Sequence, residues 1–295
     1  MLPAAAQHRT VAITFDDLPA IGARDADDAE QINRNIIAAL DQHHAPATAF
    51  VNEKGIQALG VERARDVLRL WTASGRDLAN HTFSHADFNN LAIKQFENEV
   101  TTGEPSIAAV MKESGKTVRY FRFPFNHAGD TRAKHDAALE FLAARKYQIA
   151  VCTIDNTDWE FARAYDIMRR ENRQDDADRL GKEYVEYSAK EIAYYTELHK
   201  KIFGRETPHV MLLHANHVNS DLLDRVLSAF EAQGYQFVTL DAAESDAIYQ
   251  APDTYVSSYG PMWGYRWAKQ LGVKVDGKLE PEPQQWILSY GKTKQ

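Results

Sequence analysis

The stretch TVAITFDD, residues 10–17, places a run of apolar side chains directly before two carboxylates. The run is short and rich in β-branched and aromatic residues, which is typical of a strand buried on both faces of a parallel sheet. In parallel α/β folds, the carboxyl ends of the strands form the edge at which active sites are built. The stretch therefore predicts a central strand that delivers Asp16 and Asp17 to such an edge.

Six further apolar runs follow along the chain, each bounded by Gly, Pro or polar residues. They are PATAFV (46–51), GRDLAN (75–80), VRYFRF (118–123), YQIAVCTI (147–154), HVMLLHA (209–215) and YQFVTL (235–240). Amphipathic helical patterns lie between them, over residues 30–43, 61–74, 92–113, 131–145 and 221–233. Strands that alternate with helices predict a parallel sheet covered by helices, either a barrel or a doubly wound sheet.

Two segments interrupt this alternation. Residues 160–205 are too long for one connection and carry many charges, so they read as a helical hairpin inserted after the fifth strand. The hairpin is either a solvated excursion or a wall beside a substrate cleft. The C-terminal residues 246–295 include the aromatic stretch YGPMWGYRW (259–267), which we expect to pack against the outside of the fold. We therefore predict a single domain over 1–295 with a core at about 11–245.

Composition restricts the classes of function. The chain has 295 residues, of which 44% are hydrophobic and 26% are charged, as in ordinary globular proteins. Its formal net charge of −8 argues against nucleic acid or an acidic polymer as partner. With Cys152 as the only cysteine, no internal disulfide and no thiolate cluster can form, so any metal must bind nitrogen and oxygen.

No run approaches the eighteen or so apolar residues of a membrane span, so we predict no transmembrane segment. The first residues, MLPAAAQ, resemble the end of a signal peptide, although a charged n-region and an apolar h-region are missing. We expect a periplasmic or secreted protein, with a cytoplasmic N-terminus as the alternative. The sequence does not specify an oligomeric state.

Polar side chains also end the other predicted strands. His81 and His85 follow GRDLAN, and the remaining candidates are Arg122, Asp155, Asp158 and His214. Each has an ordinary structural explanation: paired aspartates cap helices or form turns, histidines four apart share one helix face, and a histidine at a strand end sits in the core. Their joint placement at one edge favours a functional site.

The set also makes chemical sense. Two imidazoles and the Asp17 carboxylate form a three-ligand site with an open position, which suits a catalytic divalent metal that activates water. Asp16 beside it could take a proton from that water, and His214 could protonate a leaving group. The combination of metal, base and acid describes a hydrolase.

At these residues the sequence resembles the polysaccharide deacetylase family, the family 4 carbohydrate esterases that share the NodB homology domain. Five motifs match in order: TFDD at 14–17, HTFSH at 81–85, RFPF at 122–125, DNTDW at 155–159 and LLH at 212–214. They span most of the chain, and their ordered occurrence is far more specific than any single motif.

The resemblance implies a distorted (β/α)7 barrel and removal of acetyl groups from N-acetylated sugars of a polysaccharide or oligosaccharide, with release of acetate. It implies that Asp17, His81 and His85 bind the metal, most often zinc, with cobalt or nickel as alternatives. By the same resemblance, Asp16 is the general base and is oriented by Arg122. His214 is the general acid, and Asp158 raises its pKa. The Phe125 N–H donates a hydrogen bond to the oxyanion, and Trp159 and Leu212 line the acetyl pocket.

Some positions depart from the family pattern. Asn126 follows RFPF where many members have glycine, and HANH (214–217) leaves Asn216 and His217 as extra rim contacts or polar surface. Alternative functions are an O-acetyl esterase acting on xylan-type polymers, a hydrolase of small amides, and a non-catalytic carbohydrate-binding module. The last would be expected to have lost the base or the acid, and both are present.

Overall fold

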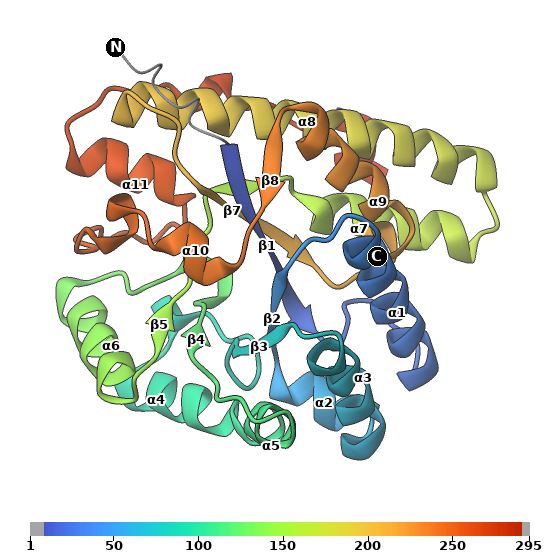
Figure 1. Cartoon of the computed structure of the whole chain (residues 1–295), viewed down its shortest axis with the longest axis horizontal. Coiled ribbons are helices and arrows are strands. Elements are labelled where there is room, and N and C mark those ends of the chain that lie inside the picture. Colours follow the sequence, from blue (N-terminus) through green and yellow to red (C-terminus); the bar gives the residue numbers. More distant parts are fainter. Residues whose placement is uncertain (1–8, 291–295) are drawn as a thin grey trace, which may run out of the picture.

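Strand β1, Arg9–Leu18, is the centre of the sheet in the computed structural model, which describes residues 9–290. It pairs in parallel with β2 (Ala47–Val51) and β8 (Tyr235–Phe237) on one side and with β7 (His209–His214) on the other. The strand is buried on both faces over most of its length, as the apolar run predicts. Figure 1 shows β1 crossing the middle of a curled sheet surrounded by helices.

The remaining strands extend the sheet from both sides of β1. They are β3 (Asp77–Asn80), β4 (Tyr120–Phe121), β5 (Gln148–Ile149) and β6 (Ile154–Asp155), and the order is β5-β4-β3-β2-β1-β7-β6. The predicted parallel barrel with seven strand positions is confirmed with one difference. The run 147–154 is interrupted, so that it pairs with β4 through β5 and with β7 through β6. One position is therefore filled by two short strands, which distorts the barrel.

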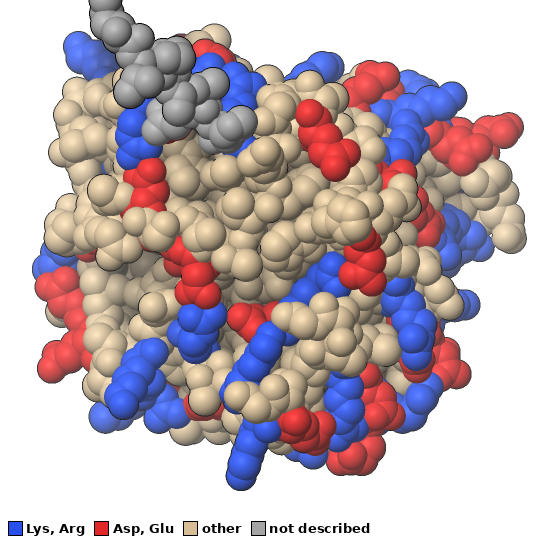
Figure 2. Space-filling model, in the orientation of Figure 1, with Lys and Arg blue, Asp and Glu red and all other residues tan. Residues whose placement is uncertain are grey.

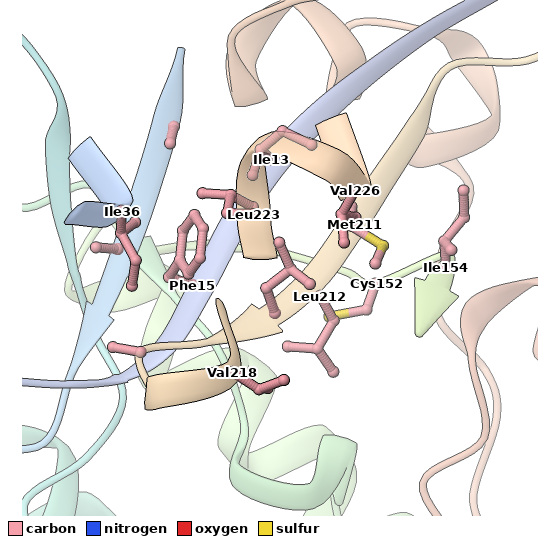
Figure 3. Packing of buried hydrophobic residues seen from close by; sticks show 14 of the residues in the cluster. Ile13, Phe15, Ile36, Cys152, Ile154, Met211, Leu212, Val218, Leu223 and Val226 are labelled. Carbon is pink, nitrogen blue, oxygen red and sulfur yellow. The ribbon is translucent and has the colours of Figure 1, made fainter. Parts of the chain in front are cut away.

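Side-chain alternation along the strands separates two layers of core. One cluster lies inside the barrel and combines Ala12 with residues of the neighbouring strand positions, namely Phe50, Ala79, Tyr120, Ala150 and Val210. The other lies between the sheet and the helices; Figure 3 shows Ile13 and Phe15 of β1 with Met211 of β7 beside residues of the covering helices. Thr14 and Asp16 share the inner face with Ala12, which directs their side chains along the barrel axis.

Helices cover the outside of the sheet. They are α1 (Ala26–Gln42), α2 (Glu53–Leu59), α3 (Val61–Ala73), α4 (Ile93–Thr102), α5 (Pro105–Glu113), α6 (Arg132–Ala144) and α9 (His217–Ala232), with 3₁₀ turns η1 (Phe88–Asn90) and η2 (Pro124–Asn126). The single helix expected over 92–113 is two helices, because Pro105 lacks an N–H donor and begins α5 instead of continuing α4. α9 begins before the predicted residue 221, because Asn216 caps it by accepting from the Asn219 N–H.

Helices α7 (Asp158–Arg170) and α8 (Gln174–Phe203) occupy the segment where a helical hairpin is predicted. One face of α8 is buried in the main core, through Leu180, Tyr184, Tyr187, Ile192, Tyr195 and Leu198. The hairpin packs against α9 and β6, and Figure 1 shows α8 running along one side of the barrel. It is therefore a covering layer of the fold and not a solvated excursion.

The C-terminal segment contains α10 (Leu240–Glu244), η3 (Ala247–Gln250), α11 (Trp263–Gln270), η4 (Gly277–Leu279) and α12 (Gln285–Tyr290). Its aromatic stretch, which we expected to pack against the outside of the fold, contacts the barrel where the run 147–154 is interrupted. The Trp263 N–H donates to the Cys152 carbonyl at 3.0 Å, in the interruption between β5 and β6, and both Trp263 and Trp267 are buried. The stretch thus covers the distorted side of the barrel.

Positive and negative side chains are interspersed over the face shown in Figure 2, with no large basic patch on it. Within residues 9–290, no helix combines the length and the apolar character that crossing a bilayer requires. The MLPAAAQ stretch, on which the expectation of export rests, lies outside the described residues.

Candidate metal and catalytic site

Asp16 and Asp17 both face the site, although simple strand alternation would send adjacent side chains to opposite faces. Asp16 continues the inner face of β1 and lies in register with His214 of β7. Between Phe15 and Leu18 the register with β2 shifts, and Asp17 has a φ of 61°. Asp tolerates this left-handed conformation better than most residues, and a bulge re-aims the side chain it carries. The irregularity brings the second carboxylate to the same side as the first.

The two histidines of HTFSH follow β3 and lie in a loop, not on a helix. Positive φ angles at Thr82 (70°) and His85 (57°) turn this loop so that both rings approach β1. The Nε2 atoms of His81 and His85 lie 3.8 Å and 3.6 Å from the Oδ1 atom of Asp17. One ligand atom from each of these three residues falls within 4.8 Å of the other two.

The three residues fit a divalent metal. The Oδ1 atom of Asp17 is buried and has no hydrogen-bond partner, an arrangement that is costly unless a cation faces it. The Nδ1 atom of His81 lies 2.9 Å from the Arg122 carbonyl oxygen, to which it can donate, and this leaves Nε2 free to bind a metal. Burial lowers the pKa of His85, which keeps its imidazole in the neutral form that ligates.

Arg122 follows β4 and is buried beneath the carboxylates, with its guanidinium stacked over the Phe50 ring. Its Nη1 donates to Asp16 Oδ1 at 2.7 Å and to Thr14 Oγ1 at 2.8 Å. Burial favours the neutral acid, but the charge of Arg122 and its hydrogen bond outweigh it and, with His214, hold the pKa of Asp16 below its ordinary value. Asp16 is therefore ionised and fixed in orientation.

Asp158 and His214 form the other charged pair at this edge. Asp158 is fully buried at the start of α7, and its Oδ1 lies 2.6 Å from the Nδ1 of His214. Its Oδ2 accepts from the His214 backbone N–H at 2.8 Å. Burial alone would lower the pKa of His214, but the adjacent carboxylate raises it to about 10. The imidazole is thus protonated at neutral pH.

The structure shows the contacts of Asn216 and His217 in HANH, which the sequence left as either rim contacts or polar surface. Asn216 donates to Asp158 Oδ2 at 3.1 Å, so it supports the buried carboxylate in addition to capping α9. The ring nitrogens of His217 lie near two carboxylates, 3.3 Å from Asp28 and 2.8 Å from Asp166. Asn216 is therefore part of the support of the site, while His217 joins α9 to α1 and α7.

Phe125, Trp159 and Leu212 differ in their exposure. Phe125 and Trp159 are 54% and 47% exposed, and the Phe125 ring lies edge-on to His85 with 4.5 Å between ring centroids. Leu212 is buried in β7 with only 7% of its surface exposed. Phe125 and Asn126 have φ angles of 58° and 55°. Asn126 thus adopts the left-handed conformation, and asparagine is among the few residues other than glycine that accept it.

Several residues that support the site are missing from the sequence-based prediction. Thr14 accepts from Arg122 and donates to the Met211 carbonyl at 2.6 Å, and Asn219 hydrogen bonds to Asp158. Thr14 lies inside the quoted TFDD motif, where its position two residues before Asp16 on one strand face was a usable signal. Asn219 had no such signal, because its partner lies 61 residues away.

Fold and site together define a class of protein: a parallel α/β barrel whose rim carries two histidines and an aspartate, together with an Arg-bound aspartate and an Asp-bound histidine. Residues 4–144 match the family model described as polysaccharide deacetylase. The resemblance to the polysaccharide deacetylase family that the motifs indicate is thus confirmed over this stretch of the chain.

Curated relatives carry deacetylase names. A probable peptidoglycan-N-acetylglucosamine deacetylase of Arthroderma benhamiae is 28% identical over 151 residues, which are 51% of this chain and 30% of that protein. A chitooligosaccharide deacetylase of Sinorhizobium fredii is 28% identical over 116 residues, 39% of this chain and 46% of that protein. The chain spans less than half the length of these relatives.

Solved structures share the fold. A peptidoglycan deacetylase from Bacillus subtilis superposes with a TM-score of 0.53 at 20% identity, over 81% of this chain and 91% of that one. A CE4 family pseudoenzyme from Bacillus anthracis superposes with a TM-score of 0.54 at 14% identity, over 80% of this chain and 66% of that one. These similarities support the distorted barrel described above.

Proposed function

We propose that this protein is a metal-dependent hydrolase that removes acetyl groups from N-acetylated sugars of an oligosaccharide or polysaccharide. The observation that carries the proposal is the arrangement at one rim of an unpartnered Asp17 oxygen, two histidine nitrogens, and the charged pairs Arg122–Asp16 and Asp158–His214. The names of the curated relatives, which include chitooligosaccharide and chitin deacetylases, support an N-acetylated sugar as the substrate.

Asp17, His81 and His85 would hold the metal, which when bound polarises the acetyl carbonyl and water. Asp16, ionised and oriented by Arg122, accepts a proton from the attacking water. The Phe125 N–H donates to the oxyanion of the tetrahedral intermediate. The acetyl methyl group contacts Trp159 and Leu212.

His214 protonates the leaving amine, and its environment favours amides over esters as substrates. An amine leaves poorly unless it is protonated, whereas the alkoxide of an ester depends less on an acid. Asp158 keeps the His214 imidazolium charged across neutral pH, because the Oδ1 atom of Asp158 lies 2.6 Å from the Nδ1 atom of His214 in a buried site. A group held protonated in this way serves the amide reaction.

The alternative of a non-catalytic binding module has one supporting observation, since a structural neighbour is described as a CE4 family pseudoenzyme. The fold alone therefore does not establish catalysis. In this chain the proposed base Asp16 contacts Arg122, and the proposed acid His214 contacts Asp158. This completeness favours an active enzyme.

Acetate release tests the proposal. Metal-stripped protein, with and without added Zn²⁺, is assayed on a chitin oligosaccharide and on acetylated xylan, with Asp16→Asn as the matched variant. We expect Zn²⁺-dependent release from the chitin oligosaccharide, and a loss of at least about 100-fold in the variant. Zn²⁺-dependent release from xylan alone would support the esterase, and no release from either substrate by Zn²⁺-loaded protein would support the binding module.

A further inference from the structure

The Phe123–His127 loop has a backbone conformation that needs external support. Phe125 and Asn126 are consecutive residues with positive φ, and neither is glycine. Such conformations are costly for residues other than glycine and persist where surrounding structure imposes them. Because Phe125 carries the proposed oxyanion donor, whatever imposes this conformation also places the donor.

The C-terminal stretch supplies one support through Arg266 of α11. Its Nη2 donates to the Asn126 carbonyl at 2.6 Å, and its Nε donates to the Pro261 carbonyl at 3.0 Å. Arg266 is 1% exposed, its guanidinium carbon lies 3.7 Å from the Trp263 ring centroid, and its Nη1 atom forms an ion pair with the Oδ2 atom of Asp253 at 3.7 Å. A buried ion pair is weak evidence for stabilisation of the fold, because the cost of removing its charges from water can exceed their mutual attraction.

Gly260 supplies a second support by direct contact. A Cβ atom at this position would lie 1.8 Å from the Phe125 carbonyl oxygen, a distance that no side chain can adopt. His135 adds a third link, because its ring nitrogens lie 2.9 Å from the carbonyl oxygens of Ala128 and Asp253. Three contacts therefore hold the 125–128 backbone against a segment that is more than 100 residues away in sequence.

We propose that the C-terminal segment 251–267 completes the active site by fixing the Phe125–Asn126 backbone, with Gly260 and Arg266 as positioning residues. The inference rests on the proposed function, because it assigns the Phe125 N–H to the oxyanion. Both positioning residues lie outside residues 4–144, the part of the chain that matches the family model.

The expected size of the effect follows from how an oxyanion donor works. Loss of one such donor lowers kcat by about 100- to 1000-fold, and displacement by about 1 Å costs up to 100-fold. The donor acts on charge that develops in the transition state, so its displacement lowers kcat and leaves KM little changed. A residue that only stabilises the fold would not produce this separation.

The test compares Gly260→Ala with Gly277→Ala in Zn²⁺-loaded full-length protein. Gly277 lies in η4, beyond the segment 251–267, and a Cβ there would meet nothing closer than 3.7 Å, so its variant is the matched control. On a chitin oligosaccharide we expect Gly260→Ala to lower kcat by about 10- to 100-fold with KM within about twofold. Hydrogen exchange of the 123–128 amides should become faster in Gly260→Ala, and Gly277→Ala should match wild type in both measurements.

Arg266 variants provide the second measurement and keep the test valid if Gly260→Ala does not fold. Arg266→Gln should lower kcat and speed exchange at 123–128, and Arg266→Lys should recover part of both, because an ammonium can still donate to the Asn126 carbonyl. Unchanged kcat in the folded variants of both positions, with an active wild type, would overturn this inference and leave the proposed function intact. An inactive wild type would overturn the proposed function and this inference with it.

Discussion

Asp158 is connected to three parts of the site through a single carboxylate. It faces the His214 ring, accepts from the His214 backbone N–H, and accepts from the side chains of Asn216 and Asn219. These donors leave the carboxylate well satisfied despite complete burial, which explains how a negative charge persists beneath the rim. The same charge sets the protonation state of His214.

Asp158→Asn tests this electrostatic role. Removing the negative charge destabilises the imidazolium, so the pKa of His214 should fall from about 10 and the alkaline limb of kcat should move to lower pH. At neutral pH we expect kcat for a chitin oligosaccharide to fall by about 100-fold. The measurement is a pH profile of kcat from pH 5 to 10.5.

Asp224→Asn is the matched control for that profile, because Asp224 of α9 pairs with His43, which follows α1, and neither residue belongs to the site. Its profile should coincide with that of wild type. An unshifted alkaline limb in Asp158→Asn would show that His214 is not the group that titrates there.

At the scale of an element, α8 packs a histidine against β7 in the core. His199 of α8 and His209 of β7 are buried, their ring centroids lie 4.3 Å apart, and neither Nε2 has a hydrogen-bond partner. Burial lowers the pKa of His199 to about 3, and burial together with His199 lowers that of His209. Both rings are therefore neutral in the folded state.

This pair should make the fold sensitive to acid. Between about pH 6.5 and pH 3 the unfolded chain binds a proton on His199 and the folded chain does not, so the free energy of unfolding falls as the pH falls, by up to about 1.4 kcal/mol per pH unit. In urea titrations from pH 7.5 to 5, His199→Gln should show a weaker decline than wild type. His44→Gln, at an exposed position, should decline as wild type does, and equal slopes for all three proteins would disprove the assignment.

At the scale of the whole molecule, the candidate metal ligands join two parts of the barrel. Asp17 ends β1, whereas His81 and His85 lie in the loop after β3, with β2 between the two strands. A ligand that binds only the folded chain stabilises it, by about 2.7 kcal/mol at a free concentration of 100 times its Kd. Metal binding should therefore be visible as a change in global stability.

Added Zn²⁺ should raise the Tm of metal-stripped protein by about 5 °C or more, given how Tm scales with stability in chains of this size. Asp17→Asn should remove most of this increase, because it takes away the one anionic ligand. Asp27→Asn, at an exposed position, should retain the increase. An equal increase in Asp17→Asn would place the stabilising metal elsewhere.

Much of the fold and of the candidate site could be predicted from sequence because the signals are local. The run before Asp16 indicates a buried strand within eight residues, and parallel strands necessarily bring their carboxyl ends to one edge. The histidines of HTFSH, together with Asp16 and Asp17, could therefore be placed at one rim without any knowledge of the contacts between them. Hydrophobic periodicity likewise placed α1, α3 and α6 to within a few residues.

The sequence by itself thus determined the alternation of strands and helices, the edge that carries the polar residues, and the chemistry those residues can support. Only the tertiary structure decided that a bulge turns Asp17 toward Asp16, that the run 147–154 divides between two edges, and that Arg266 reaches the Asn126 carbonyl. The physical reason is the separation along the sequence of the residues on which each feature depends. Periodicity and strand ends are properties of a few neighbouring residues, whereas these features depend on hydrogen bonds between segments that meet only when the barrel closes.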